Sequence, residues 1–183
     1  MRDLDMARVE PEEVAGPRVL LVEDHMLFGE AMRVAMAAAG LEVVAVVGTG
    51  PDALTAADVL RPDLALVDLH MADMDGIDLG RRMLERHPGM KLIMVTGYPD
   101  STALQRAIEA KFQGFLSKDV SMREFVAAVR AVSEGHVVMP VNLASRIVGI
   151  RSDDERMAAL NAKQLTPREW EILRLLVQGV SSG

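Results

Sequence analysis

Short apolar runs alternate with longer amphipathic segments along most of the chain. The runs are rich in Val, Leu and Ile with little polar alternation, and they cover 18–23, 41–47, 63–68, 91–96 and, more briefly, 114–117. Such runs are typical of strands buried on both faces of a parallel sheet. The other segments have helical length and spacing and cover 26–39, 51–60, 75–87, 100–111 and 121–134. The pattern therefore predicts an α/β fold, a doubly wound five-stranded parallel sheet with helices on both faces.

Helix signals mark the end of this alternation. Ser121 and Glu124 form a capping box, and Gly135 stands where a helix C-terminus is expected. Beyond it, Thr166 and Pro167 begin a separate helix. We therefore expect four units: a flexible tail over 1–17, a main domain over 18–135, a partly helical linker over 136–164 and one further helix over 165–183.

Composition and charge narrow the possible functions. Half of the residues are hydrophobic but only 3% are aromatic, so the core must be aliphatic. There is no cysteine, which excludes disulfides and thiolate metal sites. The formal charge of −7 argues against a chain that is mainly a nucleic-acid surface. The start does not resemble a signal peptide, and no apolar run approaches the roughly 20 residues that span a bilayer. We expect a cytoplasmic protein without a membrane partner.

Functional side chains stand at the carboxyl ends of four of the five predicted strands. Glu23 and Asp24 end the first strand, Asp68 ends the third, Thr96 ends the fourth, and Lys118 follows the fifth. In an open parallel sheet, ligands bind at this edge, where the strand order reverses. We therefore expect these five side chains to form one site.

Three carboxylates in one small cleft require a cation. Two like charges about 4 Å apart repel by roughly 4 kcal/mol at an effective dielectric constant near 20. Carboxylate oxygens without Cys or His ligands favour Mg²⁺ or Mn²⁺. Such a cation, with Lys118 and the Thr96 hydroxyl, suits the equatorial oxygens of a transferring phosphoryl group. Asp68 is then predicted to be the nucleophile that forms an aspartyl phosphate.

The site residues lie in segments that resemble the receiver domain of two-component response regulators. The matching segments are VLLVEDH (19–25), LVDLHMADMDGIDL (66–79), MVTGY (94–98) and GFLSKD (114–119), and the resemblance covers roughly 17–135. It implies a flavodoxin-like sheet in the order 2-1-3-4-5 and a histidine kinase as phosphoryl donor. It also implies a phosphoacceptor domain that assists its own phosphorylation and dephosphorylation, and not an enzyme.

The resemblance assigns a role to each matching residue. Asp68 is the implied phosphoacceptor, Lys118 the phosphate-binding lysine, Thr96 the switch hydroxyl and Phe115 the aromatic residue that moves with it. The implied Mg²⁺ ligands are Asp24, Asp68 and the backbone carbonyl of His70, with Glu23 acting through water.

Three positions near the implied phosphate depart from the usual pattern or vary within it. Ala72 stands where the family often has proline, which predicts a looser loop after the third strand. His70 and Tyr98 flank the phosphate, and we expect these bulky side chains to shield it from water.

The remaining segment, LTPREWEILRLLVQGVS (165–181), resembles the first helix of a LuxR-type helix-turn-helix domain in the NarL/FixJ subfamily. The recognition helix that such a domain places in the major groove would follow Gly183, so we expect a truncated output domain. The resemblance implies a homodimer that binds DNA only in the complete protein.

Three alternatives remain open. Gly48, Gly50 and Ala53 match a GxGxxA dinucleotide pattern with Asp68 20 residues beyond Gly48. However, the pattern follows the second strand and leaves Lys118 unexplained, so we expect a glycine-rich turn and no nucleotide cofactor. A Mg²⁺-dependent phosphohydrolase would need a second acid where His70 stands. A receiver-like binding module that is never phosphorylated is the third alternative. The histidines, namely His25, His70, His87 and His136, lack zinc-site spacing.

Overall fold

A five-stranded parallel sheet forms the centre of the computed structural model, which describes residues 16–97 and 101–139. The strands are β1 (Arg18–Val22), β2 (Glu42–Val47), β3 (Leu64–Asp68), β4 (Lys91–Thr96) and β5 (Gly114–Ser117). The helices are α1 (Met26–Ala38), α2 (Gly50–Leu60), α3 (Gly76–Arg86), α4 (Ser101–Glu109) and α5 (Met122–Ser133). The strand order, β2–β1–β3–β4–β5, confirms the expected fold. The predicted linker beyond residue 139 and the helix over 165–183 lie outside the described residues.

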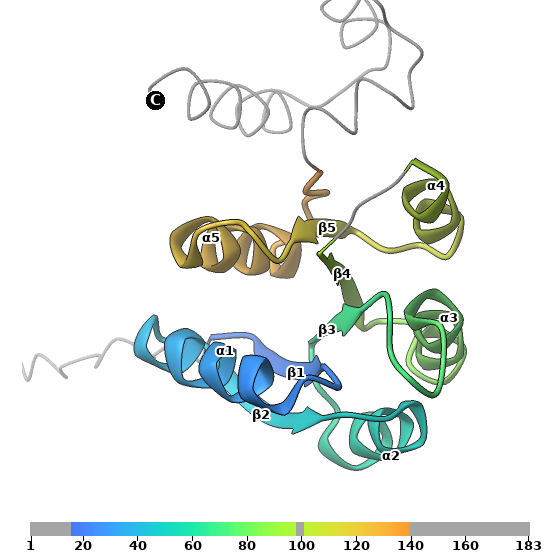
Figure 1. Cartoon of the computed structure of the whole chain (residues 1–183), viewed down its shortest axis with the longest axis horizontal. Helices are drawn as coiled ribbons and strands as arrows, with labels where there is room; N and C mark the ends of the chain where they lie inside the picture. Colours follow the sequence, from blue (N-terminus) through green and yellow to red (C-terminus); the bar gives the residue numbers. More distant parts are fainter. Residues whose placement is uncertain (1–15, 98–100, 140–183) are drawn as a thin grey trace, which may run out of the picture.

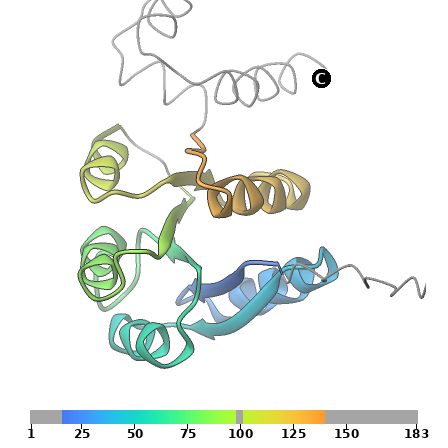
Figure 2. The ribbon, with the colours of Figure 1, turned by 180° about the vertical axis from the view of Figure 1, so that it is seen from behind.

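Helices cover both faces of the sheet. Figure 1 and Figure 2 show α1 and α5 on one side and α2, α3 and α4 on the other. Because successive strand residues point to opposite faces, Leu20 and Val22 enter the core under α2–α4. Val19 and Leu21 enter the core under α1 and α5. These two layers, mainly aliphatic with three phenylalanines, hold the carboxyl ends of the strands at one edge.

The prediction of burial on both faces is wrong for β2. This strand lies at the edge of the sheet next to β1, and its residues are exposed or half-buried, whereas β3 is buried throughout. Its apolar composition did not reveal this position, because the order of strands depends on long-range pairing.

Polar caps fix where several helices begin. Thr49 accepts a hydrogen bond from the amide of Asp52 at the start of α2, and Asp75 caps α3. Ser121 and Glu124 form the predicted capping box at α5. Gly135, just after α5, has a φ of +94°, which favours glycine. These caps orient the loops that run from the carboxyl ends of the strands.

The segment after α5 pairs with the outer edge of β5. The amide of Val138 donates to the carbonyl of Gln113 (2.8 Å), and the amide of Phe115 donates to the carbonyl of Val138 (2.9 Å). Val138 is also buried in the core under α1 and α5. The packed unit therefore includes residues beyond the boundary predicted at residue 135.

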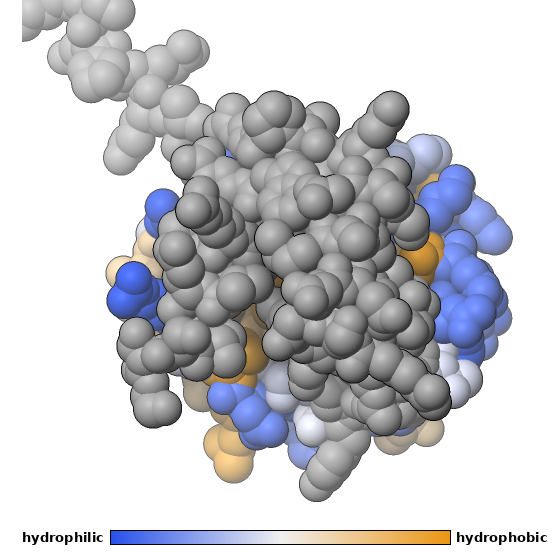
Figure 3. All heavy atoms as spheres, turned by 90° about the horizontal axis from the view of Figure 1, so that it is seen from above, coloured by the Kyte–Doolittle hydropathy of each residue, from blue (hydrophilic) through white to orange (hydrophobic). Residues whose placement is uncertain are grey.

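Hydrophilic residues dominate the visible rim of the described part, with scattered apolar patches (Figure 3). The large apolar side chains exposed in this part are Met26, Leu27, Val34, Val59, Ile108 and Val137. Over residues 16–97 and 101–139, no helix combines the length and hydropathy needed to cross a membrane.

Candidate functional site

The parallel register brings the predicted residues to one edge of the sheet. Val22 lies opposite Val67, and Asp68 lies opposite Val95. The residues that follow these positions therefore meet in space, as the sequence predicts. The structure brings together Glu23, Asp24, Asp68, Thr96 and Lys118.

Lys118 joins two of the carboxylates. Its Nζ lies 2.6 Å from Glu23 Oε2 and 2.8 Å from Asp68 Oδ2. Both acidic side chains are almost fully buried. The ammonium also lies 4.9 Å from the ring centroid of Phe28 on α1, which is a cation–π distance. Lys118 is thus fixed over the carboxylates by charge and by an aromatic face.

Two opposing influences act on the pKa of Lys118. Burial is the largest single influence and opposes the charged form. Hydrogen bonds and charge attraction from Asp68 and Glu23 together outweigh burial, so the pKa of Lys118 is raised above its ordinary value. The lysine therefore stays charged at neutral pH and compensates one of the three negative charges.

Asp24 has one oxygen held by the protein and one without a hydrogen bond. Its Oδ2 accepts from the amide of Ala72 (2.9 Å). Its Oδ1 is buried and accepts no hydrogen bond. The imidazole Nδ1 of His25 lies 3.0 Å from that atom, but it makes its hydrogen bond with Glu23 Oε1 instead. A buried carboxylate oxygen of this kind is suited to a cation.

The loop between β3 and α3 is anchored at both ends. The carboxylate of Asp73 accepts from the amide of Gly50 (2.9 Å) at the start of α2. Asp75 caps α3 and pairs with Arg106 of α4 (3.1 Å). A Cβ on Gly76 would clash with the carbonyl oxygen of Asp68, so this turn requires glycine. These contacts fix the backbone next to Asp68.

Alanine at position 72 does not leave this loop free. Its amide donates to Asp24, a hydrogen bond that proline lacks the N–H to make. The backbone thus gains an anchor that proline could not provide, while the expectation of a looser loop stays a prediction.

The two predicted switch residues are both buried. Thr96 ends β4, and its carbonyl accepts from the amide of Lys118 (2.9 Å). Phe115 lies opposite Met94, and its ring belongs to the core under α2–α4. The structure therefore shows Phe115 in an inward position. Tyr98 lies outside the described residues.

The histidines divide into one at the site and others with structural contacts. His25 follows the acidic pair directly, and it forms with Glu23, Asp24 and Asp68 a group whose ligand atoms lie within 4.8 Å of one another. Zinc-type spacing along the chain does not reveal His25 as a candidate ligand, whereas its position directly after the acidic pair is a signal in the sequence. His70 is exposed, and its amide donates to Asp68 Oδ1 (3.3 Å).

The donor set fits a hard divalent cation. Glu23, Asp24 and Asp68 offer carboxylate oxygens, which Mg²⁺ and Mn²⁺ prefer. The Asp24 oxygen without a hydrogen bond is the clearest sign of a cation site, because a bound cation would supply the partner that this oxygen lacks. Lys118 leaves two of the three carboxylate charges uncompensated, which also favours a dication.

Comparison with known proteins identifies this arrangement. A family model for the response regulator receiver domain matches residues 19–130. The chain belongs to the response regulator receiver family. It is 32% identical over 170 residues to the response regulator protein VraR of Staphylococcus aureus, covering 90% of this chain and 78% of the relative.

Solved receiver structures agree with the fold. A LuxR-family two-component response regulator from Aurantimonas sp. SI85-9A1 superposes with a TM-score of 0.69 at 25% identity, covering 73% of this chain and 96% of that one. A CheY-like receiver domain from Methanospirillum hungatei JF-1 gives a TM-score of 0.62 at 26% identity, covering 65% and 94%. The chain is thus a receiver of a two-component system with LuxR-family relatives.

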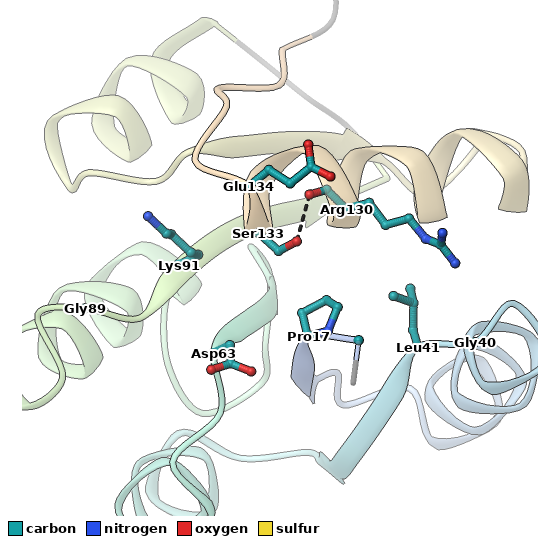
Figure 4. Close-up of a pocket in the computed structure, with 10 residues that line it drawn as sticks. Pro17, Gly40, Leu41, Asp63, Gly89, Lys91, Arg130, Ser133 and Glu134 are labelled. Atoms are coloured by element: carbon teal, nitrogen blue, oxygen red, sulfur yellow. Dashed lines mark hydrogen bonds between the residues drawn. The ribbon is translucent and has the colours of Figure 1, made fainter. Parts of the chain in front are cut away.

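A hollow of about 600 Å³ lies at the opposite edge of the receiver sheet, among the amino ends of the strands (Figure 4). Its lining mixes charges of both signs, with Lys91 and Arg130 near Asp63 and Glu134. Its lining includes none of the carboxylates of the receiver site. The hollow is therefore separate from the candidate site at the carboxyl edge.

The glycine-rich turn of the receiver does not resemble a dinucleotide site in its contacts. The carboxylate of Asp73 already binds the amide of Gly50 at the start of α2, where a pyrophosphate would bind. A Cβ on Gly50 would lie 2.9 Å from the sulfur of Met74, so the turn is filled by the β3–α3 loop. These contacts favour the structural interpretation of the turn.

Proposed function

We propose that this receiver is cytoplasmic and that its Asp68 accepts a phosphoryl group from a cognate sensor histidine kinase. The observation that carries this proposal is the buried Asp68 carboxylate, paired with Lys118 and next to the partly unsatisfied Asp24. A nucleophile, a fixed cation and a site for a dication are the parts that phosphoryl transfer needs.

Asp24, Asp68 and the backbone carbonyl of His70 would hold Mg²⁺ or Mn²⁺, with Glu23 acting through water. The cation would neutralise charge on the phosphoryl oxygens. An Asp68 oxygen attacks phosphorus as the bond to the kinase histidine nitrogen breaks, and the electron pair of that bond stays on the nitrogen. Lys118 then donates from its ammonium to a phosphoryl oxygen, and the Thr96 hydroxyl donates to another.

The position of Thr96 suggests how phosphorylation would reach the surface that controls the output domain. As its hydroxyl turns toward the phosphoryl group, Phe115, whose ring is already buried in this structure, would turn further inward to fill the space that Thr96 leaves. The face of α4, β5 and α5 would thereby be biased toward a homodimer. In the complete protein, this dimer would regulate transcription through a LuxR-type DNA-binding domain. The side chains of His70 and Tyr98 would slow hydrolysis of the acyl phosphate.

Intact-mass spectrometry after treatment with acetyl phosphate and Mg²⁺ tests the proposal. We expect an added phosphoryl group of about 80 Da on the wild type and none on Asp68→Asn. Asp78→Asn removes an exposed carboxylate on α3 and should behave as the wild type. An equal adduct on Asp68→Asn, or none on the wild type, would contradict the assignment.

A further inference from the structure

His25 places a nitrogen between two carboxylate oxygens of the site. Its Nδ1 lies 3.0 Å from Glu23 Oε1 and 3.0 Å from Asp24 Oδ1. The first oxygen accepts a hydrogen bond from the imidazole, and the second is buried without a hydrogen bond. Together with an oxygen of Asp68, these atoms lie within 4.8 Å of one another, a spacing that the ligands of one cation can have.

The other oxygens of these two carboxylates are engaged elsewhere. Glu23 Oε2 is paired with Lys118 at 2.6 Å, and Asp24 Oδ2 accepts from the amide of Ala72. The protein therefore holds the far oxygen of each carboxylate and turns the near one toward His25. Outer contacts of this kind orient metal ligands in proteins.

The helix that begins after His25 does not use the imidazole. His25 occupies the N-cap position of α1, but its side chain makes no capping hydrogen bond. The side chain is 74% exposed, so a hydrated cation can reach it from solvent. Neither packing nor capping therefore holds the ring, and its contacts with the carboxylates of Glu23 and Asp24 set its position.

We propose that His25 is a fourth ligand, through Nδ1, and that this receiver binds borderline transition-metal dications such as Zn²⁺ more tightly than Mg²⁺. The proton that Nδ1 donates to Glu23 in this structure would be released to solvent or carried on Nε2, which leaves the Nδ1 lone pair for the metal. Imidazole nitrogen suits Zn²⁺, whereas Mg²⁺ prefers oxygen ligands. This inference rests on the proposed function, because it assigns a further ligand to the same cation site. Zn²⁺ bound there would compete with Mg²⁺ for Glu23, Asp24 and Asp68.

Calorimetric titration of the full 183-residue chain with ZnCl₂ and with MgCl₂ tests the proposal. His25→Asn removes the imidazole and keeps a good N-cap for α1. We expect it to weaken Zn²⁺ binding on the order of tenfold or more and to leave Mg²⁺ binding unchanged. His70→Asn is the matched control, because the side chain of His70 is exposed and outside the group of ligand side chains, and the substitution keeps the backbone carbonyl.

Long-range ¹H–¹⁵N NMR supplies a readout at the ligand atom. We expect Zn²⁺ to shift the Nδ1 signal of His25, identified by its loss in His25→Asn, and to leave that of His70 unchanged. If Mg²⁺ binds but Zn²⁺ affinity is equal in the wild type and His25→Asn, this inference fails and the proposed function stands. If the wild type binds neither cation, the inference and the magnesium site of the proposed function both fail.

Discussion

Lys118 stabilises the site when no dication is bound, because it is the cation paired with both Glu23 and Asp68. Removing one partner of a buried ion pair lowers the free energy of unfolding by about 3–5 kcal/mol. For Lys118→Met we expect a loss at the lower end, about 3 kcal/mol, because this lysine is 19% exposed. Urea unfolding without divalent cations measures the loss. Mg²⁺ should restore more stability to this variant than to the wild type.

Lys91→Met is the control, because Lys91 lies at the opposite edge of the sheet. Equal unfolding midpoints for Lys118→Met and Lys91→Met would contradict the bridging role. The sign of the pH dependence follows from the raised pKa of Lys118. The contribution of Lys118 to the free energy of unfolding is fully present below the lysine pKa of the unfolded chain. It is lost only as pH rises through the higher pKa of the folded protein.

The amide of Ala72 orients Asp24 for the cation. Ala72→Pro removes this N–H, while Ala72→Ser keeps it. Because loss of an orienting hydrogen bond typically weakens metal binding 10- to 100-fold, we expect Mg²⁺ affinity to fall by about tenfold in the proline variant alone. Calorimetric titration checks this. Equal Mg²⁺ affinities for the proline and serine variants would show that the amide does not matter.

At the scale of residues, the sequence allowed prediction of the side chains at the strand ends but not of their orientation. Asp68 and Lys118 were predictable because a parallel sheet brings strand ends together. The amide of Ala72 was not, because a backbone hydrogen bond depends on the path of the loop. His25 carried a signal in its position next to Glu23, but its geometry depends on the turn into α1.

At the scale of elements, the start of α5 depends on the capping box. Ser121 accepts from the amide of Glu124, and the Glu124 carboxylate accepts from the amide of Ser121. Ser121→Ala should lower the free energy of unfolding by about 1 kcal/mol. Ser133→Ala removes a hydroxyl at the other end of α5 and should cost less. Thermal unfolding compares the two, and equal losses would contradict a specific capping effect.

Acid should weaken the same cap. Hydrogen bonds from the Ser121 side chain and amide lower the pKa of Glu124 below its ordinary value. Because the pKa of Glu124 is lower in the folded protein, its contribution to stability is present above the pKa of the unfolded chain. That contribution is lost as pH falls through the folded-state pKa. The stability difference between the wild type and Glu124→Gln should therefore shrink at acid pH.

The helices and strands themselves were largely predictable, since caps and apolar runs are local signals. The burial of β2 was not. An edge strand and a central strand can have the same apolar composition. What makes β2 an edge strand is that it pairs on one side only, with β1.

At the scale of the whole molecule, the segment around Val138 runs beside β5, the strand that ends just before Lys118. Val138 bonds to Gln113 and to the amide of Phe115, and Lys118 follows the same strand. A change at Phe115 during phosphorylation would therefore act directly on the backbone that leads to residue 140 and beyond. Hydrogen exchange with and without acetyl phosphate and Mg²⁺ measures this coupling.

We expect phosphorylation to change exchange at the amides of Phe115 and Val138, because these two groups share one pair of strand-like hydrogen bonds. The amides of β2 serve as the internal control, since this strand lies at the other edge of the sheet. Asp68→Asn should show no change at any of these amides. Altered exchange near the site with unchanged exchange at Val138 would mean that the signal leaves the receiver through another surface.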